Sequence, residues 1–401
     1  MKIVVAQSEL LFALKEIAKV ASKRPTHADF GDVKISPSTG GISLHAVNDA
    51  TKQEVVISVP AYTEDFDNYF YVNISNMVDS VSSIGKSEPV EIVGGEESVS
   101  VAGENSGVKY VLSIQQTSKV RDGVEMFAKQ EFKQMSIHSE ALWKAINSTV
   151  FGASGDPAKQ ILTEVNFDLE GNKITVVATN GHIMPVISID GVTESSESEL
   201  EFTIPAKLLK EFAKILKKKD ISPLTSIKVF DNYIEIAFSL GKTDFNYKVA
   251  RMNATYPNYS QLFPDKFIFN ATLKEKEFSQ ASKGAYNVSK GWNNVVKLSF
   301  EDSGVTMTAN DGEENGRTFS QTLGSDFSMT TQEDNPMFEI AFNSAYLIDG
   351  LKTMPFSNEK VKLMANSPTT PAVFQPTELP NGVDYRYLVM PVQIRSWPPI
   401  M

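Results

Sequence analysis

No cysteine occurs among the 401 residues of this chain. Disulfides and thiolate metal sites are therefore excluded, and we expect a reducing, cytoplasmic compartment. Histidine is also scarce: there are four, and no two have the i, i+4 spacing of a zinc-binding helix. The sequence has no apolar run long enough to span a membrane. We expect neither a metal nor another cofactor.

Motifs of catalytic sites are missing as well. Neither a GxSxG nor a GxGxxG pattern occurs. Residues 85–87 (GKS) resemble the end of a phosphate-binding loop, but Ser80 stands where that loop needs its first glycine. Acidic pairs such as Asp65 and Asp67 are typical of solvated loops. The sequence predicts no catalytic residue, and an enzyme is the weaker interpretation.

The net charge of −11 argues against a protein that binds nucleic acid over its whole surface. Basic residues are nevertheless concentrated on two helices, one predicted to begin after Ser8 and one after Pro205, whereas acidic residues gather in loops. Exposed lysines often do no more than solvate a helix, and charge alone leaves that interpretation open. The basic residues are Lys15, Lys19, Lys23 and Arg24 on the first helix, and Lys207, Lys210, Lys214 and Lys217 on the second.

Two sequence markers recur three times. A helix-period apolar stretch begins at Leu11, Leu142 and Phe278, roughly 130 residues apart, which is a common domain length. The second marker is a β-like run that ends in Asn or Pro, followed four positions later by an apolar residue, at Met77, Leu209 and Leu347. Two markers with one period predict three copies of one domain, each with two helices.

Strand patterns fill the sequence between the helices. Runs such as 173–178 and 295–300 are apolar or alternating, and tight turns such as 170–172 separate them. We predict α+β domains, each with two helices packed on antiparallel β-sheet. The predicted boundaries are 1–130, 131–265 and 266–394, with an extra C-terminal tail at 395–401.

Four segments, in order, resemble the bacterial β sliding clamp family, the processivity subunit of DNA polymerase III. They are residues 177–182 (VATNGH), 256–259 (YPNY) with Leu262 and Pro264, 342–347 (FNSAYL) and 387–392 (YLVMPV). The first helix followed by residues 24–26 (RPT) fits the same pattern. Together these segments span almost the whole chain, and the fold of that family requires a threefold repeat.

The resemblance implies that the chain forms half of a closed ring, a head-to-tail homodimer whose helices surround duplex DNA. The basic helices would then face the phosphates in a non-specific, salt-sensitive contact. The implied partners are the catalytic subunit of DNA polymerase III, an ATP-dependent clamp loader and other proteins with short clamp-binding motifs. A clamp-like repeat scaffold that binds proteins without encircling DNA is the alternative.

The resemblance also implies a groove for partner peptides between the middle and last domains, filled by a few apolar anchors. Where many relatives carry arginine, this chain has Ile183, Gln261 and Gln393, so we expect a less basic rim and a weaker preference for acidic peptides. By motif, the groove residues are Leu162, Thr179, Gly181, His182, Met184, Pro257, Leu262, Thr370, Val389, Met390, Pro391 and Val392.

For the dimer interface, Tyr110 and Leu112 are the apolar candidates, and the opposing region at 282–291 is polar. The tail carries Trp397 and Ile400, and both a disordered tail and one that docks on an apolar groove remain open.

Overall fold

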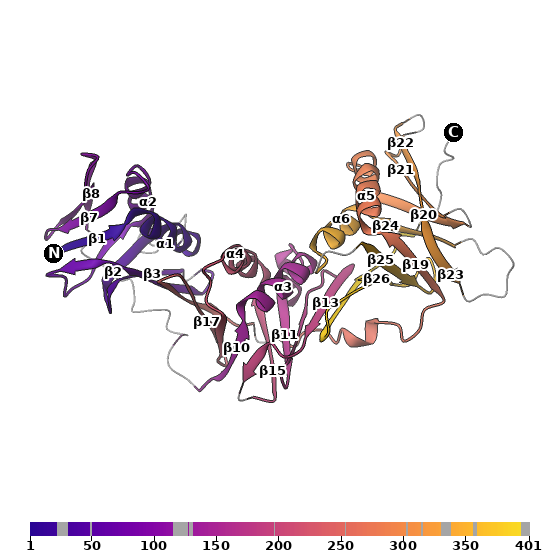
Figure 1. The fold of residues 1–401 in the computed structure, drawn as a ribbon, viewed down its shortest axis with the longest axis horizontal. Coiled ribbons are helices and arrows are strands. Elements are labelled where there is room, and N and C mark those ends of the chain that lie inside the picture. Colours follow the sequence, from indigo (N-terminus) through magenta and orange to yellow (C-terminus); the bar gives the residue numbers. More distant parts are fainter. Residues whose placement is uncertain are drawn as a thin grey trace. The chain divides into compact units, whose positions relative to one another are not determined.

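The structure is a computed structural model that describes residues 1–21, 31–48, 50–114, 127, 131–195, 197–252, 254–301, 304–313, 316–329, 338–355 and 359–393. Over this part of the chain, one order of elements recurs three times: a strand, a helix, five strands, a second helix and three strands (Figure 1). The α+β fold with a threefold repeat is therefore confirmed. The exact domain boundaries stay a prediction, and residues 395–401 lie outside the described part.

The bounds of the elements follow this order in each copy. The first copy contains β1 Lys2–Ala6, α1 Gln7–Val20, β2 Asp32–Ser38, β3 Gly41–Asn48, β4 Gln53–Pro60, β5 Tyr62–Glu64, β6 Phe70–Asn73, α2 Ile74–Ser82, β7 Pro89–Gly94, β8 Ser98–Gly103 and β9 Lys109–Ser113. The second contains β10 Lys133–His138, α3 Ser139–Thr149, η3 Val150–Gly152, η4 Pro157–Thr163, β11 Glu164–Glu170, β12 Lys173–Val177, β13 Ile183–Ile189, β14 Thr193–Ser195, β15 Glu199–Pro205, α4 Ala206–Leu216, β16 Leu224–Val229, β17 Tyr233–Leu240 and β18 Thr243–Ala250. The third contains η5 Ser260–Leu262, β19 Phe269–Lys274, α5 Glu275–Ser289, β20 Val295–Glu301, β21 Gly304–Asn310, β22 Thr318–Leu323, β23 Ser325–Met329, β24 Phe338–Asn343, α6 Ser344–Thr353, β25 Lys360–Ala365, β26 Ala372–Pro376 and β27 Val383–Val389.

The second sequence marker is a helix start. The side chain of Asn73 accepts a hydrogen bond from the Asn76 backbone N–H at 3.2 Å, and Asn343 accepts one from Ala345 at 3.0 Å. Such caps satisfy backbone donors that the first helical turn leaves free. The predicted cap at Ser8 is wrong: α1 begins at Gln7 after Ala6, which makes no side-chain capping bond.

The chain divides into two compact units. Unit 1 comprises residues 1–139, 194–197 and 215–253, and unit 2 comprises 140–193, 198–214 and 254–401. Unit 1 holds a five-stranded sheet, β5-β1-β7-β8-β9, and a nine-stranded sheet, β14-β10-β16-β17-β18-β4-β3-β2-β6. Unit 2 holds a nine-stranded sheet, β15-β11-β12-β13-β27-β26-β25-β19-β23, and a four-stranded sheet, β22-β21-β20-β24.

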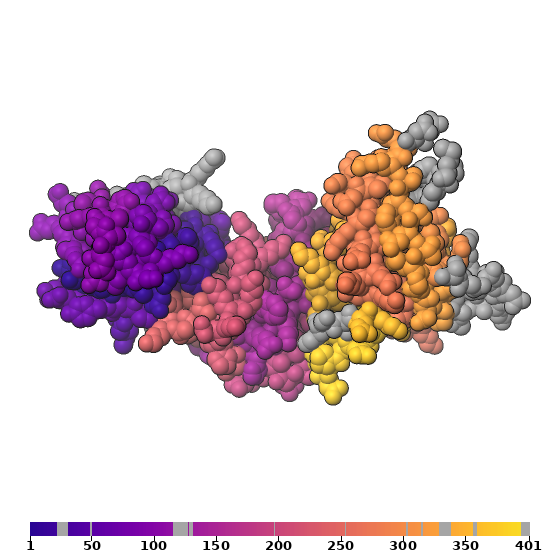
Figure 2. Space-filling view, turned by 45° about the horizontal axis from the view of Figure 1, so that its top comes forward, coloured from indigo at the N-terminus to yellow at the C-terminus, as the bar shows by residue number. Residues whose placement is uncertain are grey.

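Each nine-stranded sheet continues from one copy into the next through an antiparallel joint. In unit 1, β18 pairs with β4, and in unit 2, β27 pairs with β13. The strands of the middle copy are therefore shared between the two units. Figure 2 shows the first copy, coloured indigo to purple, as closely packed atoms on the face in view.

Helices cover one face of the sheets. In unit 1, α1 buries Leu10, Leu14 and Ile17 and packs on α2, β3 and β4. In unit 2, the Tyr385 hydroxyl donates to the Ser148 carbonyl of α3 at 3.5 Å, and the Tyr387 hydroxyl donates to the Tyr346 carbonyl of α6 at 2.9 Å. The odd-numbered residues of β27 thus face the helices, and its even-numbered residues lie on the outer face. Among the described residues, no helix is long and apolar enough to cross a membrane.

An ion pair crosses the unit 1 joint. Lys248 of β18 lies 3.1 Å from the buried carboxylate of Glu54 in β4, and His45 lies 3.6 Å from the same oxygen. Burial alone would raise the pKa of Glu54, but His45 and Lys248 together hold it below its usual value. The pair therefore keeps a carboxylate charged inside the joint.

We expect K248M to lower the thermal unfolding midpoint, because it leaves the Glu54 carboxylate buried without its closest cation, at a cost of about 2–3 kcal/mol. The E54Q/K248M double variant should recover part of this loss, and K242M in the exposed β17–β18 turn should have little effect. Scanning calorimetry measures all three. A double variant no more stable than K248M would contradict this account of the joint.

Candidate functional sites

An apolar cluster lies on the outer face of the nine-stranded sheet of unit 2. It consists of Val177, Met184, Val186, Tyr256 and Leu388, with Ile161, Tyr259 and Phe263 packed against it. The register sets Val177 opposite Val186 and Met184 opposite Leu388, so these side chains share one face across three strands. Tyr256 and Tyr259 come from the loop between β18 and β19, which covers this floor.

The β12–β13 loop is fixed by its own hydrogen bonds. The Thr179 hydroxyl donates to the Ile183 carbonyl at 2.8 Å, and the Asn180 side chain accepts from the backbone N–H groups of His182 and Ile183. Gly181 has φ of +92°, a conformation that a side chain would strain. The Met390 N–H donates to the His182 carbonyl at 2.8 Å. Residues of the second and third copies therefore meet at one end of the floor.

The other predicted groove residues lie at different depths around this floor. Leu162 is half-buried in η4, Leu262 is 52% exposed, and Met390 is 36% exposed. Val389 is fully buried and faces the core, so only its backbone reaches the outer side. The remaining residues, which lie in loops or just after β27, are Pro257, Thr370, Pro391 and Val392.

Sequence reasoning missed a buried polar group beside the floor. Glu164 and Asn166 of β11 and Thr203 of β15 lie on the same outer face, and each is at most 5% exposed. Burial raises the pKa of Glu164 to about 7, partly opposed by the nearby Thr203 hydroxyl. Glu164 Oε2, Asn166 Oδ1 and Thr203 Oγ1 have no well-formed hydrogen bond among the described residues. In the sequence, β11 alternates polar and apolar residues (EVNFDLE), a pattern typical of a strand with one exposed face, so nothing marks its first polar positions as buried.

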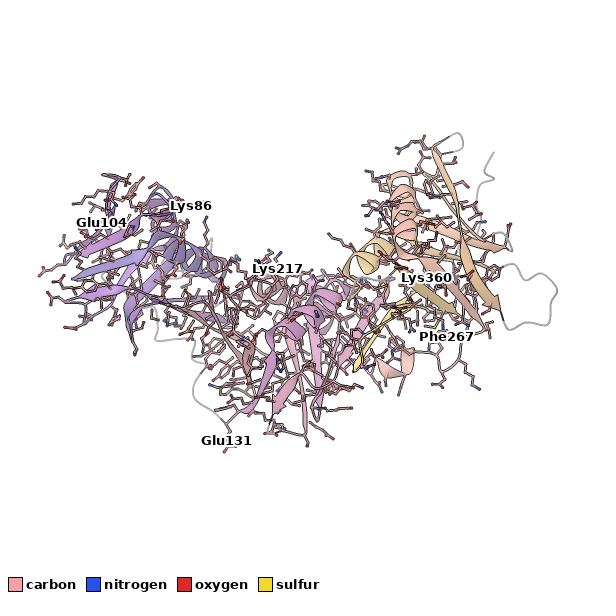
Figure 3. All side chains as sticks on the ribbon, viewed as in Figure 1. Lys86, Glu104, Glu131, Lys217, Phe267 and Lys360 are labelled. Carbon is pink, nitrogen blue, oxygen red and sulfur yellow. The ribbon has the colours of Figure 1, made fainter. Side chains whose placement is uncertain are left out.

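The basic helices expose their lysines. Lys15 and Lys217 are exposed in unit 1, and so are Lys207 and Lys210 in unit 2; Figure 3 labels Lys217 just past the end of α4. Two further lysines are held by ion pairs with their own helix, Lys19 with Glu16 and Lys214 with Glu211, each at 2.7 Å. The predicted Lys23 and Arg24 lie outside the described residues.

The candidate interface residues Tyr110 and Leu112 lie on β9, at the edge of the five-stranded sheet. Their cross-strand partners, Val101 and Val99, are fully buried on the core face. Tyr110 continues that apolar face to the edge, where it is 39% exposed.

We expect the buried carboxyl of Glu164 to make unit 2 less stable as pH rises. The folded state holds the proton up to about pH 7, whereas the free carboxyl loses it near 4.5, so stability falls through this window. At about pH 8, E164Q should raise the free energy of unfolding by about 1–3 kcal/mol, and at about pH 5 the gain should shrink. The control is E96Q, in the exposed β7–β8 turn. Equal gains at both pH values, measured by calorimetry, would refute the assignment.

Comparisons with known proteins agree with this fold. Residues 136–258 match the family model "DNA polymerase III beta subunit, central domain", and residues 260–393 match "DNA polymerase III beta subunit, C-terminal domain". The beta sliding clamp of Synechococcus elongatus is 26% identical over 99% of this chain and all of its own length. That of a Synechocystis species is 25% identical over 98% of this chain.

Solved structures share the fold. The DNA polymerase III beta subunit of Pseudomonas aeruginosa superposes with a TM-score of 0.83 at 18% identity, over 98% of this chain and all of that one. The beta subunit from Streptococcus pyogenes gives the same TM-score, identity and coverage. Relatives in this family are named as clamps, in line with the expectation of a non-catalytic subunit. On the evidence of both family models, this chain belongs to the DNA polymerase III beta subunit family, the bacterial sliding clamps.

Proposed function

We propose that the chain forms a head-to-tail homodimeric ring that encircles duplex DNA and tethers the replicative polymerase. The pairing of strands across the repeat carries this proposal. The last strand of the second copy, β18, pairs with the fourth strand of the first, β4. Likewise β27, the last strand of the third copy, pairs with β13, the fourth strand of the second.

One pair of equivalent strands is left over in this scheme. They are β9, the last strand of the first copy, and β22, the fourth strand of the third, and each is an edge strand of its sheet. An exposed edge is a template for pairing with another chain. If β9 pairs with β22 of a second copy, and β22 with β9 of that copy, two chains close a ring through two identical joints.

Both edges carry apolar side chains on the core face. On β9 these are Tyr110 and Leu112, and on β22 Phe319 lies on the same face as its buried partner, Ala309. The Phe319 ring lies over Gly284 of α5, where an added Cβ would come within 2.4 Å of it. A glycine at this position therefore allows an aromatic ring to complete the face at the joint.

We expect Y110S/L112S to convert the dimer to a monomer, because it removes the apolar face from both joints at once. In sedimentation velocity, the dissociation constant should rise at least about tenfold, the equivalent of about 1.4 kcal/mol. Y62S is the matched control, since Tyr62 is 62% exposed on β5 at the opposite edge of the same sheet. A double variant that dimerises like the parent would contradict the assigned interface.

We propose that duplex DNA contacts the lysine-bearing faces of α1 and α4 without sequence preference. Such contacts weaken with salt because they work by releasing counterions from the phosphates. A closed ring needs no tight grip, since the DNA is held topologically and the ring slides.

Retention on DNA separates a clamp from a scaffold that only binds proteins. After loading by an ATP-dependent loader, the parent should remain on circular DNA at high salt and be lost when the circle is cut, because a ring slides off an end. The Y110S/L112S variant should not be retained on either. Equal retention on circular and linear DNA would favour the scaffold.

We propose that the apolar cluster with the surrounding loops binds short peptides of partner proteins, in the partner groove formed by the twelve residues predicted from the sequence. The partners are the polymerase III catalytic subunit, the clamp loader and other proteins with clamp-binding motifs, and the complex works in the cytoplasm on the nucleoid. The apolar floor beneath a half-exposed rim supports this proposal, because short motifs bind through a few buried anchors.

The M184A/M390A variant should weaken binding of a polymerase-derived peptide by about tenfold or more, since it removes one floor and one rim side chain. M307A is the control, because Met307 is fully buried elsewhere in unit 2, in the four-stranded sheet. Fluorescence anisotropy measures the affinities. If M184A/M390A binds as well as M307A, the groove lies elsewhere.

A further inference from the structure

A strip of carboxylates lies on the outer face of unit 2. Along β11, the residues Val165, Phe167 and Leu169 are fully buried on the core face, so Asp168 and Glu170 lie on the outer face. The neighbouring strand β15 places Glu201 directly opposite Asp168 and Glu199 directly opposite Glu170. We call Asp168, Glu170, Glu199 and Glu201 the acidic strip.

Like charges oppose each other across the acidic strip, although the Asn166 side-chain amide donates a hydrogen bond to Glu201 at 3.1 Å. Like charges directly opposite each other on paired strands destabilise a sheet. Burial raises the pKa of Asp168, and the charges of Glu170, Glu201 and Glu199 raise it further. Lys173 is the one cation on the outer face of β11, β12 and β15. It is the cross-strand partner of Glu170, at one end of the strip. The strip therefore offers negative charge that an incoming cation would relieve.

Tyr259 connects the acidic strip to the partner groove. Tyr259 packs against the apolar floor, and burial raises its pKa to about 12, with further contributions from the charges of Asp168, Glu201 and Glu170. Phe263 packs on the same floor and lies under the guanidinium of Arg386, 4.4 Å from its ring centre. Arg386 is itself paired with Asp384 at 3.1 Å. The strip is thus one border of the floor.

Unsatisfied acceptors lie on the same two strands as the strip, β11 and β15. Glu164 Oε2, Asn166 Oδ1 and Thr203 Oγ1 are buried on the same sheet face and lack a well-formed hydrogen bond among the described residues. Each of these oxygens can accept a hydrogen bond, and lysine and arginine are the side chains that bring donors and positive charge together.

We propose that the acidic strip selects partner peptides that carry lysine or arginine beside their apolar anchors. This inference rests on the proposed partner groove and specifies the chemistry of its occupant. The apolar anchors fill the floor, and the basic flank lies over β11 and β15, where it relieves the repulsion between the paired carboxylates. Charge complementarity of this kind sets the choice of partner and the association rate more than the total affinity.

Three fluorescent peptides test the proposal. They share a glutamine and a Leu-Phe anchor pair and differ only in their flanks, which carry two lysines, two serines or two aspartates. The proteins are the full-length parent, the strip variant E170Q/E199Q and the control E96Q/E97Q, which removes two exposed carboxyls in unit 1. Affinities are measured by anisotropy at low and at high salt.

For the parent at low salt, we expect the lysine-flanked peptide to bind about three- to tenfold more tightly than the aspartate-flanked one. High salt should remove most of this preference, because Glu170, Glu199 and Glu201 are exposed. E170Q/E199Q should reduce it at least about twofold, and E96Q/E97Q should keep it. Equal binding of all three peptides would overturn the proposal, and so would a preference for the lysine-flanked peptide that is unchanged in E170Q/E199Q. Either result would leave the proposed partner groove intact. If no peptide binds, the partner groove itself fails and the inference fails with it.

Discussion

Antiparallel pairing between strands of successive copies is the interaction on which the rest of the structure depends. A clamp-type domain leaves its fourth and its last strand at the edges of its half-sheets, and an unpaired edge is both unsatisfied and prone to association. The joints β18–β4 and β13–β27 satisfy these edges within the chain. They also position two other features. The ion pair of Glu54 with Lys248 crosses one joint, and the apolar floor of the partner groove spans the other.

Much of the fold follows from local sequence. The capping residues Asn73 and Asn343 and the apolar period of the helices depend on neighbours a few positions away, so the repeat, the helices and most strands are visible in the sequence. The pairing of Lys248 with Glu54, which are 194 residues apart, has no local signal. The division of the middle copy between two compact units depends on such distant pairs, and sequence patterns do not reveal it.

The candidate site shows the same limit. The resemblance supplied groove residues from motifs, but Val389 is buried on the core side. The strand of Glu164 alternates polar and apolar residues, so the sequence alone does not show that its first polar positions are buried. Which face a side chain occupies depends on register, and one residue of slip moves it to the other face. The acidic strip illustrates this point, since Asp168 and Glu201 are opposed only in the folded sheet.

The proposed ring closes where β9 of one chain pairs with β22 of another. The absence of native cysteine makes this directly measurable, because any disulfide must join engineered residues. A set of double variants would place one cysteine on β9, at Val111 or Ser113, and one on β22, at Ser320 or Thr322, with N246C/V56C across the β18–β4 joint as an intrachain reference. Opposed strand residues are close enough for a disulfide. We expect covalent dimers for at least one β9–β22 combination. If every combination stays monomeric while the reference disulfide forms, β9 does not pair with β22 in the dimer.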